Sequence, residues 1–200
     1  MILAVFITGF FVRGKIQENA IIRVDAFENR YDELKAEGST IEQTNINARL
    51  AVYEEIAALQ EEIEIFAAKN SGFAAARAYS ISAEIYEEQA NWIAAERVWL
   101  ASAKASGKSY FAPVSYFNAA VAAEEQGNFL AAIEHYSRVL DYGDNFPVVV
   151  KAQFSIARLY DYSLNDREAA LEAYRKLLGK WPYDPLWANL AQSRIIVLTD

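Results

Sequence analysis

The segments Asn91-Trp92-Ile93-Ala94-Ala95, Asn128-Phe129-Leu130-Ala131-Ala132 and Asp166-Arg167-Glu168-Ala169-Ala170 are three versions of one pattern. They begin 37 and then 38 residues apart, a period typical of stacked repeat units. Four residues after the last alanine of each version stands a large aromatic residue, namely Trp99, Tyr136 or Tyr174. This spacing predicts a chain of similar units, each packed on its neighbours.

Each unit is predicted to hold two helices joined by a tight turn. An aromatic residue (Tyr79, Tyr116 or Phe154) opens the first helix, which ends at Ala90, Gly127 or Asn165, and the repeated pattern opens the second. Glycine and proline separate the units at Ser106-Gly107, at Gly143 to Pro147 and at Pro182 to Pro185. Because no stretch alternates with period two for long enough to indicate a sheet, the fold class is all-α, a helix-turn-helix repeat solenoid.

Composition narrows the classes of function. The chain has 200 residues, 27 acidic against 19 basic, and a formal net charge of -8. A net negative charge disfavours a surface that binds the negatively charged phosphate backbone of nucleic acid, so no nucleic-acid partner is expected. The absence of cysteine excludes disulfides, thiolate zinc sites and a cysteine nucleophile.

No catalytic, cofactor-binding or metal-binding residue is predicted. His135 is the only histidine and is interpreted as an ordinary residue on a helix surface. The carboxylates at Glu54-Glu55 and at Glu61 to Glu64 are interpreted as a solvated face, because adjacent helical residues do not face one another. Gly107-Lys108-Ser109 lacks the upstream glycine of a phosphate-binding loop. The chain is therefore not expected to be an enzyme.

The first twelve residues, MILAVFITGFFV, carry no charge. As a helix they would span roughly 18 Å, whereas a bilayer core needs about 30 Å. Three interpretations remain open: part of a membrane anchor, the core of a signal segment, or an apolar helix that packs on the body or drives oligomerisation. The anchor is favoured, since Arg13 and Lys15 follow the apolar run, whereas a signal segment has its positive charges before it.

Residues 13–72 are predicted to form two further helices, a spacer and a leading cap. The spacer extends from Lys15 to Glu37, with its apolar stripe at Ile16, Ala20, Val24, Phe27, Tyr31 and Leu34, and ends at Gly38. Capping-box spacings at Ser39 and Thr40 predict a second helix from about residue 41 to Lys69. Its predicted buried face is Ile46, Leu50, Tyr53, Ile56, Ala57, Ile63, Phe66 and Ala67. The repeat domain then occupies residues 73–200.

Over residues 74–182 the units resemble the tetratricopeptide repeat family. The matching residues are Tyr79, Ala83, Tyr86, Trp92, Ala95 and Trp99; Tyr116, Ala119, Ala120, Gly127, Phe129, Ala132 and Tyr136; and Phe154, Ala157, Ala170, Tyr174, Leu177 and Pro182. In departures from the motif, Ala90 and Asn165 replace the turn glycine, Arg167 the turn aromatic and Arg158 a small contact residue. The alanines lie where two helices cross closely. Leu186 to Leu198 is expected to be a solvating helix that caps about three units.

The resemblance implies a concave groove, lined by the first helices, that binds protein or peptide segments. The residues expected to line it are Arg77, Ser80, Glu84, Glu87 and Glu88, then Val114, Phe117, Asn118, Val121, Glu124 and Glu125, then Ala152, Ser155, Leu159 and Tyr162. This groove is apolar in its middle and acidic at one edge. In the alternative, Phe117 and Val121 simply pack on a neighbouring helix and the glutamates form a solvated rim. The family's chaperone-tail clamp is not expected, because only Asn118 falls at a matching position.

An apolar N-terminus, a helical spacer and a small repeat array are together similar to membrane-anchored bacterial envelope proteins of this family, such as the ancillary subunit of the Sec translocon. That similarity implies an inner-membrane protein with an extracytoplasmic body that binds or scaffolds polypeptides during export or assembly; a cytoplasmic location is the alternative. A second hypothesis makes the chain a structural subunit of a stable homo- or hetero-oligomer without transient clients.

Overall fold

A computed structural model describes the backbone of residues 2–144 and 146–200 and the side chains of residues 14–144 and 146–200. Its elements are α1 (Ile2–Thr40), α2 (Ile46–Lys69), α3 (Gly72–Glu88), α4 (Trp92–Ser106), α5 (Phe111–Glu125), α6 (Phe129–Val139), α7 (Pro147–Arg158), the π-helical turn η1 (Leu159–Ser163), α8 (Arg167–Lys180) and α9 (Trp187–Thr199). Every element of the described chain is a helix, which confirms the all-α prediction.

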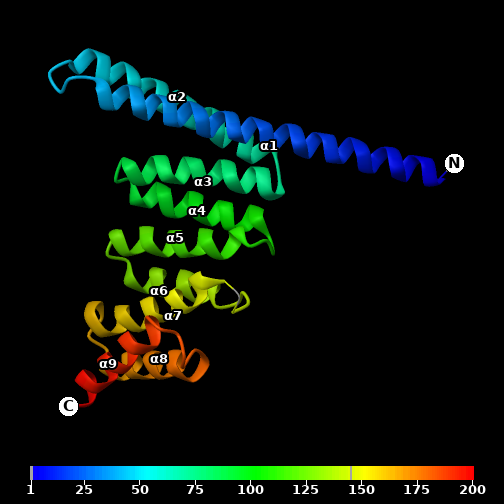
Figure 1. The fold of residues 1–200 in the computed structure, drawn as a ribbon. Helices are drawn as coiled ribbons and strands as arrows, with labels where there is room; N and C mark the ends of the chain where they lie inside the picture. Colours follow the sequence, from blue (N-terminus) through cyan, green and yellow to red (C-terminus); the bar gives the residue numbers. More distant parts are fainter. Residues whose placement is uncertain (1, 145) are drawn as a thin grey trace.

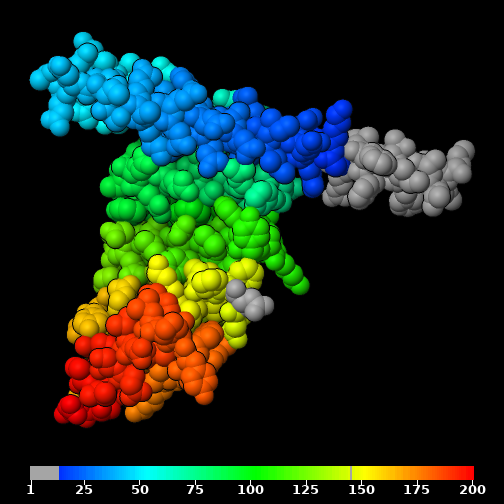
Figure 2. All heavy atoms as spheres, in the orientation of Figure 1, coloured from blue at the N-terminus to red at the C-terminus, as the bar shows by residue number. Residues whose placement is uncertain are grey.

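The helices stack in chain order into a column. Each helix packs against the one before it and the one after it, as a helical solenoid requires (Figure 1). The hairpin of α1 and α2 lies across one end, and α8 and α9 form the other (Figures 1 and 2). The side chains of residues 1–12, the predicted anchor, are outside the described residues. Within the described part of the chain, no helix has the length and apolar character needed to cross a membrane.

The turns inside the three units share one backbone geometry. Ala90, Gly127 and Asn165 all have left-handed φ angles, of 53°, 73° and 52°. The next residue caps the second helix, since Asn91, Asn128 and Asp166 accept the backbone N–H of Ala94, Ala131 and Ala169 at 3.3, 3.4 and 3.0 Å. The left-handed residue and the N-cap after it are therefore shared by all three units, even where alanine or asparagine replaces glycine. The third turn contains one more residue, since Asp166 donates its N–H to the carbonyl of Tyr160, six residues back, whereas Asn91 and Asn128 each donate five residues back.

The packing of the units confirms the predicted helix crossings. Ala95, Ala132 and Ala170 are fully buried, so the two helices of each unit approach closely at these positions. Trp99, Tyr136 and Tyr174 are also buried and fill the space between elements.

The start of α2 was predicted wrongly. The hydroxyls of Ser39 and Thr40 donate back to the carbonyls of Ala36 and Glu37 at 2.7 and 2.8 Å, so α1 continues through Gly38 to Thr40. Asn45 supplies the N-cap by accepting the N–H of Ala48 at 3.2 Å, and α2 therefore begins at Ile46.

Half of the predicted α2 face is also wrong. Ile63 and Ala67 are buried as expected, together with Val52 and Leu59, but Ile46, Leu50, Tyr53 and Ala57 are exposed. The reason is that α3 ends at Glu88, beside Val52, Tyr53 and Ile56, so the first turns of α2 extend past it (Figure 1). In α1 the predicted stripe is confirmed at Val24, Phe27, Tyr31 and Leu34, while Ile16 is exposed.

Helix α9 covers the last unit without providing the expected solvating face. Ala188 and Ala191 are buried against the unit, but Leu186, Leu190, Ile196 and Val197 are exposed. Asn189, Gln192 and Ser193 are exposed on the same side, so α9 covers the last unit with a mixed polar and apolar surface and not with the polar surface that was predicted.

Candidate functional site

The first helices of the units form one continuous layer. α3, α5 and α7 contact one another in order, and the layer is extended by α1 beyond α3 and by α9 beyond α7. The second helices α4, α6 and α8 each pack between two members of this layer. We call the solvent-facing side of α1, α3, α5 and α7 the first-helix face, which is the surface that the sequence predicted as a groove.

The first helix of the third unit is offset by one residue from the predicted alignment. The ring of Phe154 lies 5.6 Å from that of Tyr174, just as Phe117 lies 5.0 Å from Tyr136. Phe154 therefore corresponds to Phe117 and not to Tyr116. With this register Ala157, fully buried, takes the small-contact position that had been assigned to Arg158.

The π-helical turn η1 accommodates the extra residue. In this turn Leu164 donates its backbone N–H to the carbonyl of Leu159, five residues earlier, at 2.9 Å. Before it, α7 follows the earlier units with a spacing of 37 residues; after it, Asp166 follows Asn128 with a spacing of 38. The change in period thus lies between Leu159 and Asp166.

Three predicted groove residues of the third unit consequently lie in the core. Ala152, Ser155 and Leu159 are buried, which corrects their assignment to an open surface. The corresponding positions belong to Lys151, Phe154 and Arg158, of which Lys151 is exposed and the other two are half-buried. Tyr162 is exposed, as predicted.

In the first two units the predicted residues fall into three groups. Ser80 and Phe117 are buried, Phe117 with the Lys151 ammonium 4.6 Å from its ring centroid, so neither offers an open contact surface. The half-buried group is Arg77, Glu87, Asn118, Val121 and Glu124, and the exposed group is Glu84, Glu88, Val114 and Glu125. Much of the predicted groove is therefore packed, and its open part lies at the two ends of the helices.

Glu87 and Glu124 belong to a repeated structural contact that was not predicted. The indole N–H of Trp99 donates to Glu87 at 2.7 Å, and the Tyr136 hydroxyl donates to Glu124 at 2.6 Å. In the third unit the Tyr174 hydroxyl donates to Asp161 at 3.2 Å. The three carboxylates stand 37 residues apart, so their common period was a signal available in the sequence.

Glu124 and Asp161 each also bind an arginine from the first helix of the following unit. Arg158 contacts Glu124 at 2.5 Å, and Arg194 contacts Asp161 at 2.8 and 3.1 Å. At the position corresponding to Arg158, the second unit has Val121, which cannot supply a cation to Glu87. Burial raises the pKa of Glu87, and the hydrogen bond from Trp99 offsets part of that effect.

Carboxylates gather at the C-terminal ends of α3 and α5. Glu84, Glu88 and Glu125 are exposed there, where the helix dipole is also negative. Desolvation and the nearby carboxylates of Glu87 and Glu28 raise the pKa of Glu84. We call this part of the first-helix face the acidic edge.

Aromatic side chains gather at the opposite ends of the same helices. The ring of Phe73 at the start of α3 lies 6.3 Å from Tyr110 and 5.9 Å from Phe111, which begins α5. Phe73 and Tyr110 are exposed, as is Val114 one turn further along α5. These residues, the aromatic edge, were not predicted, although Phe73 and Tyr110 are also 37 residues apart.

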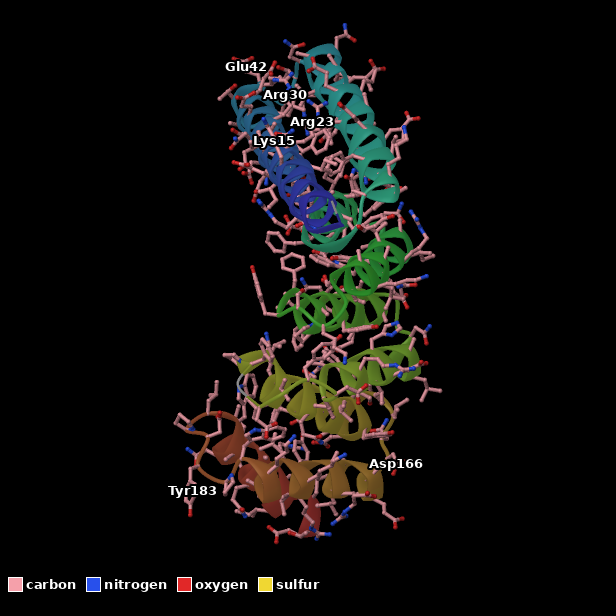
Figure 3. The ribbon with its side chains drawn as sticks, turned by 90° about the vertical axis from the view of Figure 1, so that its right-hand side faces the viewer. Lys15, Arg23, Arg30, Glu42, Asp166 and Tyr183 are labelled. Carbon is pink, nitrogen blue, oxygen red and sulfur yellow. The ribbon has the colours of Figure 1, made fainter. Side chains whose placement is uncertain are left out.

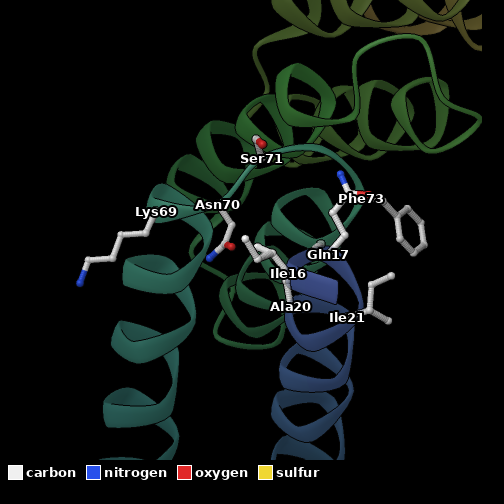
Figure 4. A pocket seen from close by; sticks show the side chains of 9 residues that line it. Ile16, Gln17, Ala20, Ile21, Lys69, Asn70, Ser71 and Phe73 are labelled. Carbon is white, nitrogen blue, oxygen red and sulfur yellow. The ribbon is translucent and has the colours of Figure 1, made fainter. Parts of the chain in front are cut away.

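A pocket adjoins the aromatic edge where α1 meets the turn between α2 and α3. Its volume is about 410 Å³, and its lining residues are Ile16, Gln17, Ala20, Ile21, Lys69, Asn70, Ser71, Phe73 and Ala74 (Figure 4). Arg77 lies close by, with its guanidinium 5.9 Å from the Phe73 ring and hydrogen-bonded to Asp25 at 2.6 Å and to Glu28. The pocket extends the apolar surface of the aromatic edge onto α1.

The described side chains contain no group of three or more histidine, aspartate or glutamate residues that could hold a metal ion. His135, predicted on the helix surface, is half-buried, and its Nε2 lies 2.8 Å from Glu96. The same carboxylate accepts a hydrogen bond from Gln126 at 2.6 Å, so His135 takes part in a contact that links α4, α5 and α6.

Comparison with known proteins gives two matches. Residues 151–182 match a family model described as tetratricopeptide repeat. The chain is also 37% identical over 128 residues to a protein of Treponema pallidum (strain Nichols) described as TPR repeat-containing protein. The match covers 64% of this chain and 52% of that relative, so the chain spans about half the length of the curated relative. No solved structure matches.

Proposed function

This chain is a tetratricopeptide-repeat protein, and we propose that it binds segments of other proteins along its first-helix face. Repeats of this family generally serve as interaction modules. The proposal rests on one observation: the aromatic edge and the acidic edge lie at opposite ends of the same two helices, α3 and α5. Such a surface suits a segment with an apolar or aromatic anchor at one end and basic residues at the other.

The length of α3 sets the length of the segment. From Phe73 to Glu88 the helix rises about 22 Å. An extended segment of about seven residues covers that distance, and a helical one needs about fifteen. Attraction between the acidic edge and basic side chains weakens with salt over a Debye length of about 10 Å at 0.1 M, whereas the apolar contact persists.

The test is a titration with a synthetic probe peptide that carries a tryptophan at one end and three lysines, seven residues away, at the other. We expect Tyr110→Ala to weaken binding at both low and high salt. We expect Glu84→Lys combined with Glu125→Lys to weaken it mainly at low salt. The control for Tyr110→Ala is Tyr53→Ala, because Tyr53 is 56% exposed and Tyr110 is 58% exposed. The control for the double glutamate variant is Glu54→Lys combined with Glu134→Lys, since both of these glutamates are exposed away from the acidic edge.

Binding that is unchanged in the Tyr110 and glutamate variants would contradict the proposal, as would an equal loss in the controls. Melting temperatures of all variants must be compared first, because a variant that unfolds would lose binding for another reason.

For location, we propose that residues 1–12 hold the chain at a bacterial inner membrane with the repeat body outside the cytoplasm, where it takes part in envelope export or assembly. The uncharged sequence MILAVFITGFFV supports this, together with its position at the start of the long helix α1. The chain without residues 1–14 is expected in the aqueous phase of a detergent partition, and the whole chain in the detergent phase. Recovery of the whole chain from the aqueous phase would favour the cytoplasmic alternative.

The alternative function is that of a structural subunit in a stable oligomer. It is favoured by one observation, the apolar outer side of α9. Sizing of the purified protein separates the two functions, because a single stoichiometric complex supports the structural one and varied co-purified polypeptides support client binding.

A further inference from the structure

In the second unit, the carboxylate of Glu124 binds two donors, one on each oxygen. The Tyr136 hydroxyl donates to Oε1 at 2.6 Å, and the Arg158 guanidinium donates to Oε2 at 2.5 Å. In the third unit, Asp161 likewise accepts a tyrosine hydroxyl from α8 and the guanidinium of Arg194. An aromatic donor and an arginine together therefore complete this carboxylate position in both units.

In the first unit, Glu87 has the aromatic donor but lacks the arginine. The indole N–H of Trp99 donates to Oε1 at 2.7 Å, the same oxygen that the tyrosine uses in the second unit. Val121 stands 37 residues before Arg158, at the corresponding place on α5, and its side chain is short and apolar. Among the described side chains, none donates to Oε2 of Glu87 or forms an ion pair with it. One oxygen of a half-buried carboxylate is thus left without a donor.

Neighbouring cations of α1 and α3 are already paired with other carboxylates. Lys35 contacts Glu88 at 3.4 Å, and Arg77 binds two carboxylates of α1. Arg23 and Arg30, which Figure 3 shows on the hairpin of α1 and α2, pair with glutamates of α2. The donor that Glu87 lacks is therefore not supplied by these side chains.

The surroundings of this oxygen favour a cation from outside the chain. Glu87 and Val121 are both half-buried, so they remain accessible from the first-helix face. Glu84, one turn earlier on α3, and Glu125, at the end of α5, are exposed and add negative potential. Arginine fits better than lysine, because its planar guanidinium is less strongly hydrated and is the group that both other units use. Its methylene stem can pack on the apolar Val121.

We propose that an arginine side chain of the bound protein segment donates to Oε2 of Glu87 and lies over Val121, in the place that Arg158 takes beside Glu124. This inference rests on the proposed binding along the first-helix face and adds the identity of one recognised residue. From Phe73 to Glu87, α3 rises about 21 Å, so in an extended segment the arginine follows the aromatic anchor by about seven residues.

The first experiment compares two synthetic peptides that differ in one residue. Both carry a tryptophan at one end and, about seven residues away, either arginine or citrulline, which has nearly the same shape without the charge. The parent protein is expected to bind the arginine peptide about tenfold more tightly, the effect of one charge-assisted hydrogen bond. Glu87→Gln is expected to remove most of this preference, whereas Tyr110→Ala is expected to weaken both peptides alike.

These variants separate the two proposals. Peptides whose binding depends on Tyr110, but whose arginine preference survives in Glu87→Gln, would overturn the arginine site and support the proposed function. Binding that does not depend on Tyr110, but whose arginine preference is lost in Glu87→Gln, would support the arginine site and contradict the proposed function.

The second experiment fills the site from within the chain. Val121→Arg is expected to pair with Glu87 as Arg158 pairs with Glu124, which abolishes the arginine preference and raises the melting temperature. Val197→Arg is the matched control, because it makes the same substitution at an exposed position of α9. A Val121→Arg variant that keeps the preference, or that is no more stable than Val197→Arg, would overturn the proposal.

The third experiment needs no peptide. The indole N–H signal of Trp99 in an NMR spectrum, assigned with a Trp99→Phe variant, reports on the carboxylate that accepts it. Ethylguanidinium chloride is expected to shift this signal saturably in the parent, and ethylammonium chloride is expected to shift it less. In Val121→Arg the shift is expected to be lost. A Trp99 signal that does not respond, or that responds equally in Val121→Arg, would overturn the site even if neither peptide binds.

Discussion

At the scale of single residues, the turn inside each unit requires a left-handed backbone conformation, whichever residue stands there. Ala90 and Asn165 adopt the left-handed conformation that Gly127 adopts in the middle unit. A side chain with a Cβ atom makes this conformation costly by about 1–2 kcal/mol, and asparagine tolerates it better than alanine. Ala90 is therefore a strained position in an otherwise well-packed turn.

Ala90→Gly is expected to raise the free energy of unfolding by about 1 kcal/mol, since relief of strain exceeds the added entropy of the unfolded chain. Urea unfolding followed by circular dichroism measures it. As a control, Ala58→Gly places glycine in the exposed interior of α2 and is expected to lower the free energy of unfolding by about 1 kcal/mol. A destabilised Ala90→Gly variant would show that the turn is not strained.

Glu87 is expected to make stability depend on pH. Because burial raises the pKa of Glu87 above its ordinary value of 4.5, the folded protein binds the proton more tightly than the unfolded chain. Its contribution to the free energy of unfolding therefore increases as the pH falls from about 7 towards 5, and the deprotonated form is the less stable one. Glu84 contributes with the same sign.

Glu87→Gln removes this titration and keeps an oxygen that can accept the Trp99 N–H. We expect the melting temperature of the variant to change less between about pH 7 and pH 5 than that of the parent. Thermal melts of the two proteins at both pH values provide the comparison, and parallel pH profiles would contradict it.

At the scale of helices, the contact between a second-helix aromatic and a first-helix carboxylate joins the two halves of each unit. Tyr136→Phe removes one donor to Glu124 and leaves Arg158 in place. We expect a loss of about 1.5–3 kcal/mol, as is usual for a hydrogen bond to a charged group. A double-mutant cycle with Glu124→Gln, measured by urea unfolding, isolates the pair, and additive effects would show that the contact is unimportant.

The sequence predicted helices, turns and crossing alanines well because their signals are local. Asn91, Asn128 and Asp166 each cap a helix by accepting the backbone N–H of the residue three positions later. The small side chain of Ala132 indicates a close contact between the two helices of one unit. The buried face of α2 could not be predicted in the same way. It depends on where α3 ends, which is a property of another element.

At the scale of the whole molecule, the stack connects each helix mainly to its neighbours in chain order. Disturbance at one unit should therefore spread to adjacent helices and fade beyond them. Ala132 is fully buried where α5 and α6 cross, so Ala132→Leu is expected to cost about 1–3 kcal/mol by overpacking.

Hydrogen exchange read by mass spectrometry gives the spatial pattern. In Ala132→Leu we expect faster amide exchange in α5, α6 and α7 and little change in α1 and α2, whose core contacts involve α3. Uniformly faster exchange along the whole chain would show instead that the column unfolds as one cooperative body.

The candidate site could be predicted only in outline. The first-helix face and the exposed Glu84, Glu125 and Val114 follow from the repeat pattern. The burial of Phe117 confirms, for that residue, the alternative interpretation that it packs on a neighbouring helix. The pairing of Glu124 with Arg158 does not follow from the repeat pattern, because it is a contact between two units. The aromatic edge lies at helix starts, just outside the motif positions used to define the groove.

The π-helical turn at Leu159–Ser163 has a consequence for how such arrays change through insertion and deletion. A residue gained inside a helix normally rotates everything after it by about 100° and moves core side chains into solvent. Here the widened turn absorbs the gained residue, so Ala157 before it and Ala170 after it both remain in the core. An ancestral unit could thus have acquired one residue without losing its neighbours. Sequence comparisons that fix the spacing inside a repeat would misalign such a unit, whereas comparisons that allow one step at the end of the first helix would recover it.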